Sequence, residues 1–267
     1  IAGAMSISCW VYFSSSSATS LTITNKGAAP YSTSTRDFEL YLNYVSTTTR
    51  QIRFSGDSTS SATYVSSSSN INADEWTHIA VITVGDNTAS NTKIYINGQL
   101  DNTDDFINIS NTSSRPLYVG IRSDASGRPY VGNISNMAFW DDILTDDDVL
   151  NIYNNGVTQD LNNFRIQPTC WFPIDENASF WEAASGNWEV RDLSNNELLY
   201  GNNTGAIDEM QGNAPGSVAS GNGNNLTIAD LKGNMYNSNK NAYSINMADY
   251  ADGVTNPANS GRSTDTP

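Results

Sequence analysis

The sequence predicts an all-β protein: a two-sheet antiparallel jelly-roll sandwich with one short helix and an extended C-terminal arm. Short stretches of alternating or β-branched residues recur along the first 140 residues, with polar turns between them. The dipeptide Asn97-Gly98 is a strong hairpin signal, because a type I′ turn needs positive φ at both central residues. The clearest helix signals are confined to residues 145–156.

The first half of the chain supplies most of the expected strands. Residues 5–13 place Ile7, Cys9, Val11 and Phe13 on one face, as a half-buried strand does. Further strands are expected at residues 21–24, 37–45, 51–54, 62–65, 93–96, 117–120 and 131–140. Residues 76–84 carry apolar or β-branched side chains on both faces, which indicates an inner strand buried on both sides.

These stretches carry a family resemblance. The segments WTHIAV, KIYINGQL, LYVG and GNISNMAFW resemble, in pattern and spacing, the laminin-G-like, concanavalin A-like jelly-roll family over about half the chain. The resemblance implies the sandwich fold, but that fold hosts lectins, glycosidases, adhesion modules and structural proteins. We expect Trp76, Asn97, Gly98 and Trp140 to be structural, the two tryptophans through packing and the dipeptide through its turn.

One helix is expected after the last of these strands. Thr145 is a good N-cap, and the following aspartates, 146–148, lie where the helix dipole favours negative charge. Val149 and Ile152 contribute to an apolar face, and Gly156 is the expected stop.

We divide the chain into three parts: a jelly roll over residues 1–165, strands that complete the sandwich over 166–205, and a polar arm over 206–267. Residues 169–203 resemble the opening of a laminin-G-like jelly roll, yet they follow the helix. They could complete the same sandwich in permuted order, begin a second truncated one, or pair with a neighbouring subunit, and we favour the first. The arm has a composition typical of disorder, so its own sandwich or a partner would have to order it.

Composition limits the classes of partner. The formal net charge is −15, with 13 Lys and Arg residues, which disfavours nucleic-acid binding through phosphates. No apolar run approaches the roughly 20 residues of a membrane helix, so we expect no membrane span. The chain opens at Ile1 on a strand pattern without a signal peptide, and we expect a processed or partial product. The polar, turn-rich composition is typical of proteins on a virion surface or otherwise extracellular.

The two cysteines, Cys9 and Cys170, leave two alternatives open. Two small buried hydrophobic residues are favoured, and a disulfide that links the first strand to the later segment is the other reading.

Enzymatic chemistry finds little support in the sequence. A laminarinase-type glycosidase would need carboxylates in an E-x-D-x-x-E pattern, which does not occur. His78 is the only histidine and lies among expected core residues, so we interpret it as structural, and no triad or zinc site is expected.

Two groups of residues are candidates for ligand binding. Asp101, Asp104 and Asp105 could supply hard oxygen ligands to calcium at a loop rim, although a solvated acidic loop is the simpler reading. Trp181 and Trp188 lie in looser sequence than the other tryptophans and are the best candidates for stacking on a sugar.

We therefore expect a non-enzymatic structural or adhesion module, specifically a capsid-decoration or fibre protein on the virion surface of a tailed phage. The C-terminal sequence resembles tails on laminin-G-like proteins of marine phages, which implies other virion subunits as partners. Host surface glycans are a further candidate partner, because decoration proteins can bind them. The alternative is a carbohydrate-binding, lectin-like domain, for which calcium dependence is left open. A glycoside hydrolase is the third reading.

Overall fold

The computed structural model describes most of the first 174 residues and shorter parts of the rest. The described residues are 4–27, 36–56, 64–85, 92–105, 109, 117–123, 128–174 and 192–194, together with the backbone of strands at 179–182, 187–191, 200–203, 209–211, 225–227 and 244–246. Within them, no helix is long and apolar enough to cross a membrane.

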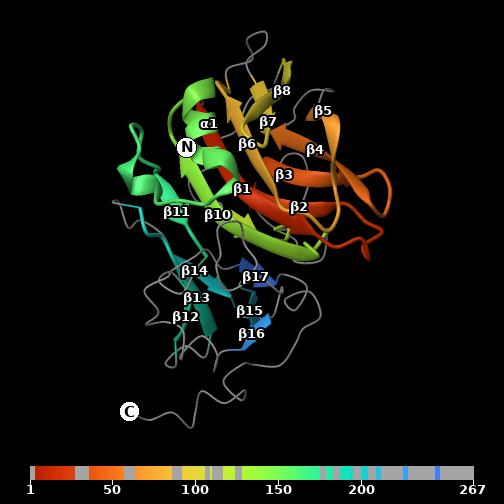
Figure 1. The fold of residues 1–267 in the computed structure, drawn as a ribbon, viewed down its shortest axis with the longest axis vertical. Coiled ribbons are helices and arrows are strands. Elements are labelled where there is room, and N and C mark those ends of the chain that lie inside the picture. The colour runs from red at the N-terminus through yellow and green to blue at the C-terminus, as the bar shows by residue number, and fades with distance from the viewer. Residues whose placement is uncertain are drawn as a thin grey trace.

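The described chain forms two main antiparallel sheets, as the sequence predicts (Figure 1). The larger sheet has the order β16-β15-β17-β10-β1-β6-β7-β8, with β11 also paired to β10. Its strands are β1 (Met5–Phe13), β6 (Thr77–Thr83), β7 (Thr92–Ile96), β8 (Gln99–Asp104), β10 (Gly132–Trp140), β11 (Cys170–Phe172), β15 (Glu209–Gln211), β16 (Asn225–Thr227) and β17 (Ser244–Asn246).

The second sheet has the order β5-β4-β3-β2-β9, and a small third sheet has the order β12-β13-β14. The second sheet consists of β2 (Leu21–Gly27), β3 (Arg36–Tyr44), β4 (Thr49–Gly56), β5 (Val65–Asn72) and β9 (Leu117–Val119). The third consists of β12 (Ser179–Glu182), β13 (Asn187–Arg191) and β14 (Tyr200–Asn203). The helices are α1 (Asp146–Tyr153) and the 3₁₀ turns η2 (Asn154–Gly156) and η3 (Leu161–Asn163).

The main core lies between the two large sheets. It takes the predicted face of β1, with Ile7, Cys9, Val11 and Phe13, against side chains such as Phe38 and Phe54 of the second sheet. Both cysteines are free and buried, which excludes the disulfide. Burial raises the pKa of each thiol to about 12, so both behave as small apolar groups.

The large sheet carries apolar side chains on both faces. Its outer face is therefore also covered, which removes those side chains from water. Helix α1 and the chain after it pack there, and Val149 and Ile152 meet Ala80, Ile82 and Trp140 in a second core (Figure 1). The fold thus has three layers: the second sheet, the large sheet, and the α1 layer. This arrangement explains why residues 76–84 carry apolar side chains on both faces.

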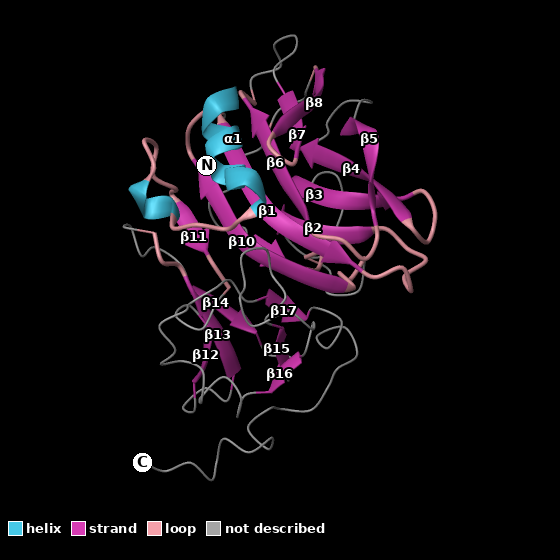
Figure 2. Ribbon diagram, in the orientation of Figure 1, coloured by secondary structure: helices cyan, strands magenta, loops and turns pink. Residues whose placement is uncertain are grey.

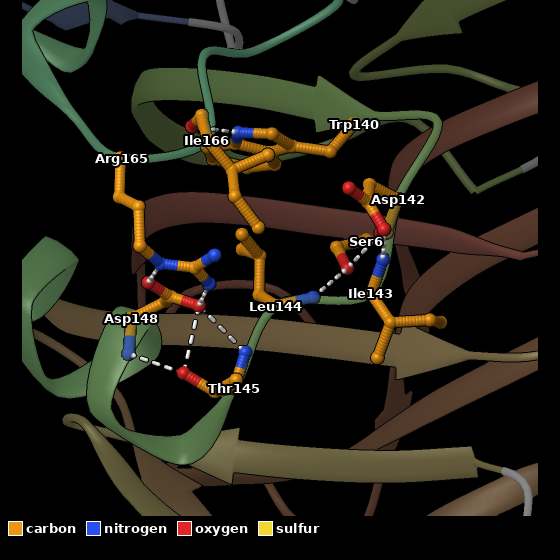
Figure 3. Close-up of polar contacts among 9 residues, drawn as sticks. All are labelled: Ser6, Trp140, Asp142, Ile143, Leu144, Thr145, Asp148, Arg165 and Ile166. Carbon is orange, nitrogen blue, oxygen red and sulfur yellow. Dashed lines mark hydrogen bonds and ion pairs between the residues drawn. The ribbon is translucent and has the colours of Figure 1, made fainter.

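The start of α1 is fixed by the capping box shown in Figure 3. The Thr145 hydroxyl accepts a hydrogen bond from the Asp148 backbone N–H at 3.2 Å, and Asp148 Oδ2 accepts the Thr145 N–H at 2.8 Å. Arg165 donates to the same carboxylate at 2.6 Å. Burial raises the pKa of Asp148, but the hydrogen bonds from Arg165 and Thr145 together bring it below its usual value. The helix ends at Tyr153, and its C-cap residue, Asn154, lies in the left-handed region (φ 47°), two residues before the predicted stop at Gly156.

Strand β10 takes partners from two distant parts of the chain along its second edge. Met137, Ala138 and Phe139 pair with β11, and Asn133 and Ile134 pair with β17. Residues 170–172 therefore join the same sheet in cis, whereas β12 to β14 form a sheet of their own. The three-part division of the chain stays a prediction.

Candidate functional site

Three loops meet at one end of the sandwich, and we call this end the rim. The loops are residues 14–20, 45–48 and 73–76, drawn in pink at the right of Figure 2. Backbone hydrogen bonds join them: Ala73 N donates to Thr48 O at 2.8 Å, and Asp74 N donates to Phe13 O at 2.9 Å. The rim is therefore a continuous surface.

A buried arginine holds the rim loops in place. The Arg50 guanidinium lies 5.0 Å from the Phe13 ring centre and 4.8 Å from that of Tyr44. It donates to the carbonyl of Ser17 in the first loop at 2.8 Å and to the carbonyl of Ser46 in the second. The Arg50 side chain thus bonds to two rim loops and lies between the second sheet, which carries it, and Phe13 of the large sheet.

Two aromatic rings in contact lie at the rim. Val11 is opposite Thr77 in the ladder, so the next residues, Tyr12 and Trp76, are neighbours on the outer face. Their ring centres are 5.8 Å apart with a tilt of 52°, and both residues are half-buried. Among the described buried side-chain atoms, Trp76 Nε1 has no hydrogen-bond partner. The Tyr12–Trp76 pair thus offers an aromatic surface at the rim.

A carboxylate lies beside this pair. Asp74 is exposed and has φ of 61°, a left-handed conformation that costs energy for a residue other than glycine. Its Oδ1 accepts long hydrogen bonds from Tyr12 Oη at 3.5 Å and from Ser15 N at 3.4 Å. Burial and the negative charge of Asp74 raise the pKa of Tyr12, so the phenol remains a donor at neutral pH.

The rest of the rim is mostly polar, with Glu75 as a second acidic residue and Val45 as an exposed apolar one. Glu75 accepts a hydrogen bond from Asn72 Nδ2 at 2.9 Å. Hydroxyl groups of Ser14, Ser16, Ser17, Thr19, Ser46, Thr48 and Thr49 bond to one another or to loop N–H groups. The rim therefore combines the rings of Tyr12 and Trp76, the carboxylate of Asp74 and many hydroxyl groups.

The predicted calcium ligands have other roles where the structure describes them. Asp101 Oδ2 accepts hydrogen bonds from the consecutive backbone N–H groups of Ser68 at 2.6 Å and Ser69 at 3.2 Å. Asp104 accepts one from Asp105 N at 2.8 Å. No three Asp, Glu, His or Cys side chains in the described ranges lie together as a metal-binding group. The calcium site stays a prediction.

The position of Asp101 leads to a stability prediction. Its carboxylate and the Asn102 side chain, which donates to Ser66 O at 2.8 Å, occupy the free edge of β5. We expect Asp101→Ala to lower the free energy of unfolding by about 1 kcal/mol, measured by urea denaturation. Asp104→Ala is the control and should stay within about 0.5 kcal/mol of wild type. A gain in stability from added Ca²⁺ that both variants abolish would instead favour the calcium site.

The remaining predicted residues fall in three places. Asn97 and Gly98 have φ of 49° and 76°, as the predicted type I′ turn requires. Trp140 is fully buried and donates to Ile166 O at 3.0 Å (Figure 3). Trp76 is half-buried at the rim just before β6, where its ring packs on Tyr12, and its structural role stays a prediction.

The two tryptophans predicted to stack on sugars lie on the third sheet. Trp181 of β12 pairs directly with Trp188 of β13 in the backbone register. Their role in binding stays a prediction.

His78 is buried in the structure, as predicted. It is 0% exposed, and its Nε2 is 2.8 Å from Ser8 Oγ. Burial lowers the pKa of His78 to about 3, so the imidazole is neutral at physiological pH.

Sequence reasoning missed Tyr12 and Asp74. Tyr12 alternates with the inward Val11 and Phe13, which was a signal that it faces outward. Nothing in the sequence indicated the left-handed backbone of Asp74 or its approach to Tyr12.

Comparison with known proteins identifies relatives of the fold. The sequence profile of the concanavalin A-like lectin/glucanases superfamily matches residues 2–150. No curated protein sequence matches the chain significantly.

Among solved structures, the chain is similar to a putative carbohydrate binding protein from Bacteroides ovatus, with 16% identity and a TM-score of 0.51 over 72% of this chain and 49% of that one. A pentraxin from Limulus polyphemus has 17% identity and a TM-score of 0.46, over 62% and 74% of the two chains. A sialidase carbohydrate-binding module from Ruminococcus gnavus, bound to α2,3 sialyllactose, has 18% identity and a TM-score of 0.44, over 57% and 83%. The chain thus spans about half the Bacteroides protein, and at these identities the likeness concerns the fold.

Proposed function

The chain belongs to the concanavalin A-like lectin/glucanases superfamily through residues 2–150, and from that membership we propose that it is a carbohydrate-binding protein whose site is the rim. Its role is to hold saccharides without cleaving them. The observation that carries this proposal is the Tyr12–Trp76 pair beside the Asp74 carboxylate.

The chemistry of the rim suits a sugar. A sugar ring has an apolar C–H face that packs on an aromatic ring, and hydroxyls at its edge that need hydrogen-bond partners. Binding sites of this kind combine aromatic walls with a few well-placed polar groups. Tyr12 and Trp76 offer the wall, and Asp74 accepts hydroxyl protons in charge-assisted hydrogen bonds.

Binding requires fewer groups than hydrolysis. A glycosidase of the usual kind needs two carboxyl groups on either side of the bond that breaks. The sequence lacks the E-x-D-x-x-E pattern of the laminarinase type. A single carboxylate beside an aromatic pair is sufficient for recognition.

A glycan array followed by titration calorimetry tests the proposal. We expect Trp76→Ala and Tyr12→Ala each to weaken the binding of an array hit at least tenfold. Losing one aromatic contact of ~60 Å² removes ~1.5 kcal/mol, which corresponds to about that factor. Tyr64→Ala is the matched control, because Tyr64 is an exposed aromatic residue at the opposite end of β5 from the rim.

Two outcomes would contradict this site. If the rim variants bind like wild type while their thermal unfolding is unchanged, the sugar binds elsewhere. If no glycan binds, with or without Ca²⁺, the proposed function is wrong. Loss of binding on adding a chelator would support the calcium-dependent form of the lectin hypothesis.

The second candidate is a structural role at a virion surface, with other virion subunits as partners. It is favoured by the arm, whose strand β17 adds to β10 at Asn133 and Ile134, so that this segment can extend a sheet. Detection of the chain in purified virus particles from its source would support this role. Its absence from such particles would contradict it.

A further inference from the structure

The outer face of the large sheet carries a second aromatic pair next to the Tyr12–Trp76 pair. Trp10 and His78 are opposite each other in the ladder, and their ring centres are 5.2 Å apart. Trp10 lies two residues from Tyr12 on β1, so both side chains share one face at a spacing of about 7 Å. The two pairs therefore form a row that runs from the rim toward α1.

The second pair holds polar atoms without partners. Trp10 is 3% exposed and His78 is 0% exposed. Among the described buried side-chain atoms, Trp10 Nε1 and His78 Nδ1 have no hydrogen-bond partner. Buried polar groups in native proteins are almost always paired, because each unpaired one costs energy. Two such atoms on neighbouring residues give this pair unused hydrogen-bonding capacity.

One side chain, Tyr153, covers this pair. Its ring stacks on Trp10 with centres 5.7 Å apart and a 27° angle, and lies 5.8 Å from His78. A Cβ placed on Gly98 would lie 2.9 Å from Tyr153 Cδ1, so the glycine leaves room for the ring.

The backbone after Tyr153 is unusual. Tyr153 is half-buried and is the last residue of α1. Asn154, Asn155 and Gly156 follow with φ of 47°, 53° and 93°. These three residues with positive φ distort the 3₁₀ turn η2, so a regular helix does not continue beyond Tyr153.

We propose that Trp10 and His78 form a second sugar subsite, closed by Tyr153 in the free protein, so that the row along β1 takes a neutral, linear oligosaccharide. This inference rests on the proposed function and adds the class of its ligand. The first sugar packs on Tyr12 and Trp76, and a following sugar displaces Tyr153 and takes its place on Trp10.

Hydroxyl chemistry identifies the ligand class. The Trp10 indole only donates, whereas the unpaired nitrogen of neutral His78 donates or accepts according to which tautomer the bond to Ser8 selects. A hydroxyl group both donates and accepts, so neighbouring sugar hydroxyls satisfy either tautomer. A carboxylate could only accept, and it would have to be desolvated in a protein of net charge −15 beside Asp74. Neutral saccharides are therefore favoured over acidic ones.

The single histidine makes the test direct, because its imidazole gives one set of NMR signals in the intact chain. The probes are the gluco-, xylo- and N-acetylglucosamine oligosaccharide series, each from one to six units. We expect a saturating trisaccharide of the series that binds to shift the His78 signals, whereas its monosaccharide leaves them unmoved.

Variants separate the two subsites by calorimetry. Tyr153→Ala removes the cover and should tighten trisaccharide binding about tenfold, with monosaccharide binding unchanged within about twofold. Trp10→Phe keeps an aromatic ring but removes the donor, and should weaken only the trisaccharide, about tenfold. Tyr153→Phe keeps the cover and is the matched control, expected to behave like wild type. Thermal unfolding checks that each variant is folded.

The possible failures are distinguishable. If no saccharide binds, the proposed function is wrong and this inference with it. If a trisaccharide binds in a Trp76-dependent manner but leaves the His78 signals unmoved, only the second subsite is wrong. Equal effects of Tyr153→Ala or Trp10→Phe on one-unit and three-unit ligands would also overturn it.

Discussion

Replacement of Gly132 by alanine is expected to lower the free energy of unfolding by about 4 kcal/mol or more, because it forces a clash between backbones. Gly132 begins β10, opposite Phe13 of β1, with φ of 137°. A Cβ there would lie 2.0 Å from the Tyr12 carbonyl oxygen and 2.8 Å from Phe13 Cα. Neither atom belongs to a flexible side chain, so the two central strands must separate at this end.

Gly156→Ala is the matched control for this variant. Gly156 also has positive φ, 93°, but the nearest atom to an added Cβ is the Tyr153 hydroxyl oxygen at 3.7 Å, an ordinary contact. We expect a cost of about 1 kcal/mol from the backbone conformation alone. Urea denaturation of both variants measures the difference. Similar values for the two would show that the close approach of Tyr12 and Gly132 does not determine stability.

Gly132 also affects the rim, because it lies against the backbone of Tyr12. Its close approach fixes the Tyr12 backbone, and Tyr130 Oη donates to the Tyr12 carbonyl at 3.3 Å. A Gly132→Ala protein that remains folded at low temperature should therefore bind saccharide more weakly, because the ring of Tyr12 moves with its backbone.

The pattern of apolar residues predicted those strands in which the strand's own side chains determine which face is buried. Residues 5–13, 37–45 and 131–140 alternate or are apolar throughout, and they closely match β1, β3 and β10. Strand β5 was predicted at residues 62–65 but runs from Val65 to Asn72, through four serines. Serine has little intrinsic preference for strands, and side chains far away in the sequence, Asp101 and Asn102, occupy the edge of this one.

The candidate site was less predictable, because the exposure of its side chains depends on where helix α1 and the chain after it stop covering the large sheet. Trp76 and His78 lie on one face, and the sequence gives no reason for one to be half-exposed and the other buried. Helix α1 ends over Trp10 and His78, and its last residue covers them. Similarly, the composition around Asp101 is suitable for calcium, but only the fold reveals that its carboxylate accepts N–H groups of β5.

Acidification from pH 7 to pH 5 is expected to destabilise the protein through His78. Burial lowers the pKa of His78 to about 3 in the folded state, from an ordinary value of 6.5. Below pH 6.5 the unfolded chain takes up a proton that the folded chain does not, so stability falls until the pH reaches about 3. The full loss is roughly 5 kcal/mol, of which roughly 2 kcal/mol appears by pH 5.

A histidine-free variant isolates this effect. His78→Gln keeps a group that can bond to Ser8, and its stability should be nearly constant between pH 7 and pH 5. Among the described residues, the carboxyl groups with shifted pKa values are Asp146 and Asp148. Their pKa values are lowered from 3.8, so their stabilisation is lost only at lower pH. Urea denaturation at pH 7, 6 and 5 measures the difference between the two proteins. Parallel losses would contradict a buried neutral His78, whereas a loss in wild type alone supports the closed, dry environment that Tyr153 maintains over the second aromatic pair.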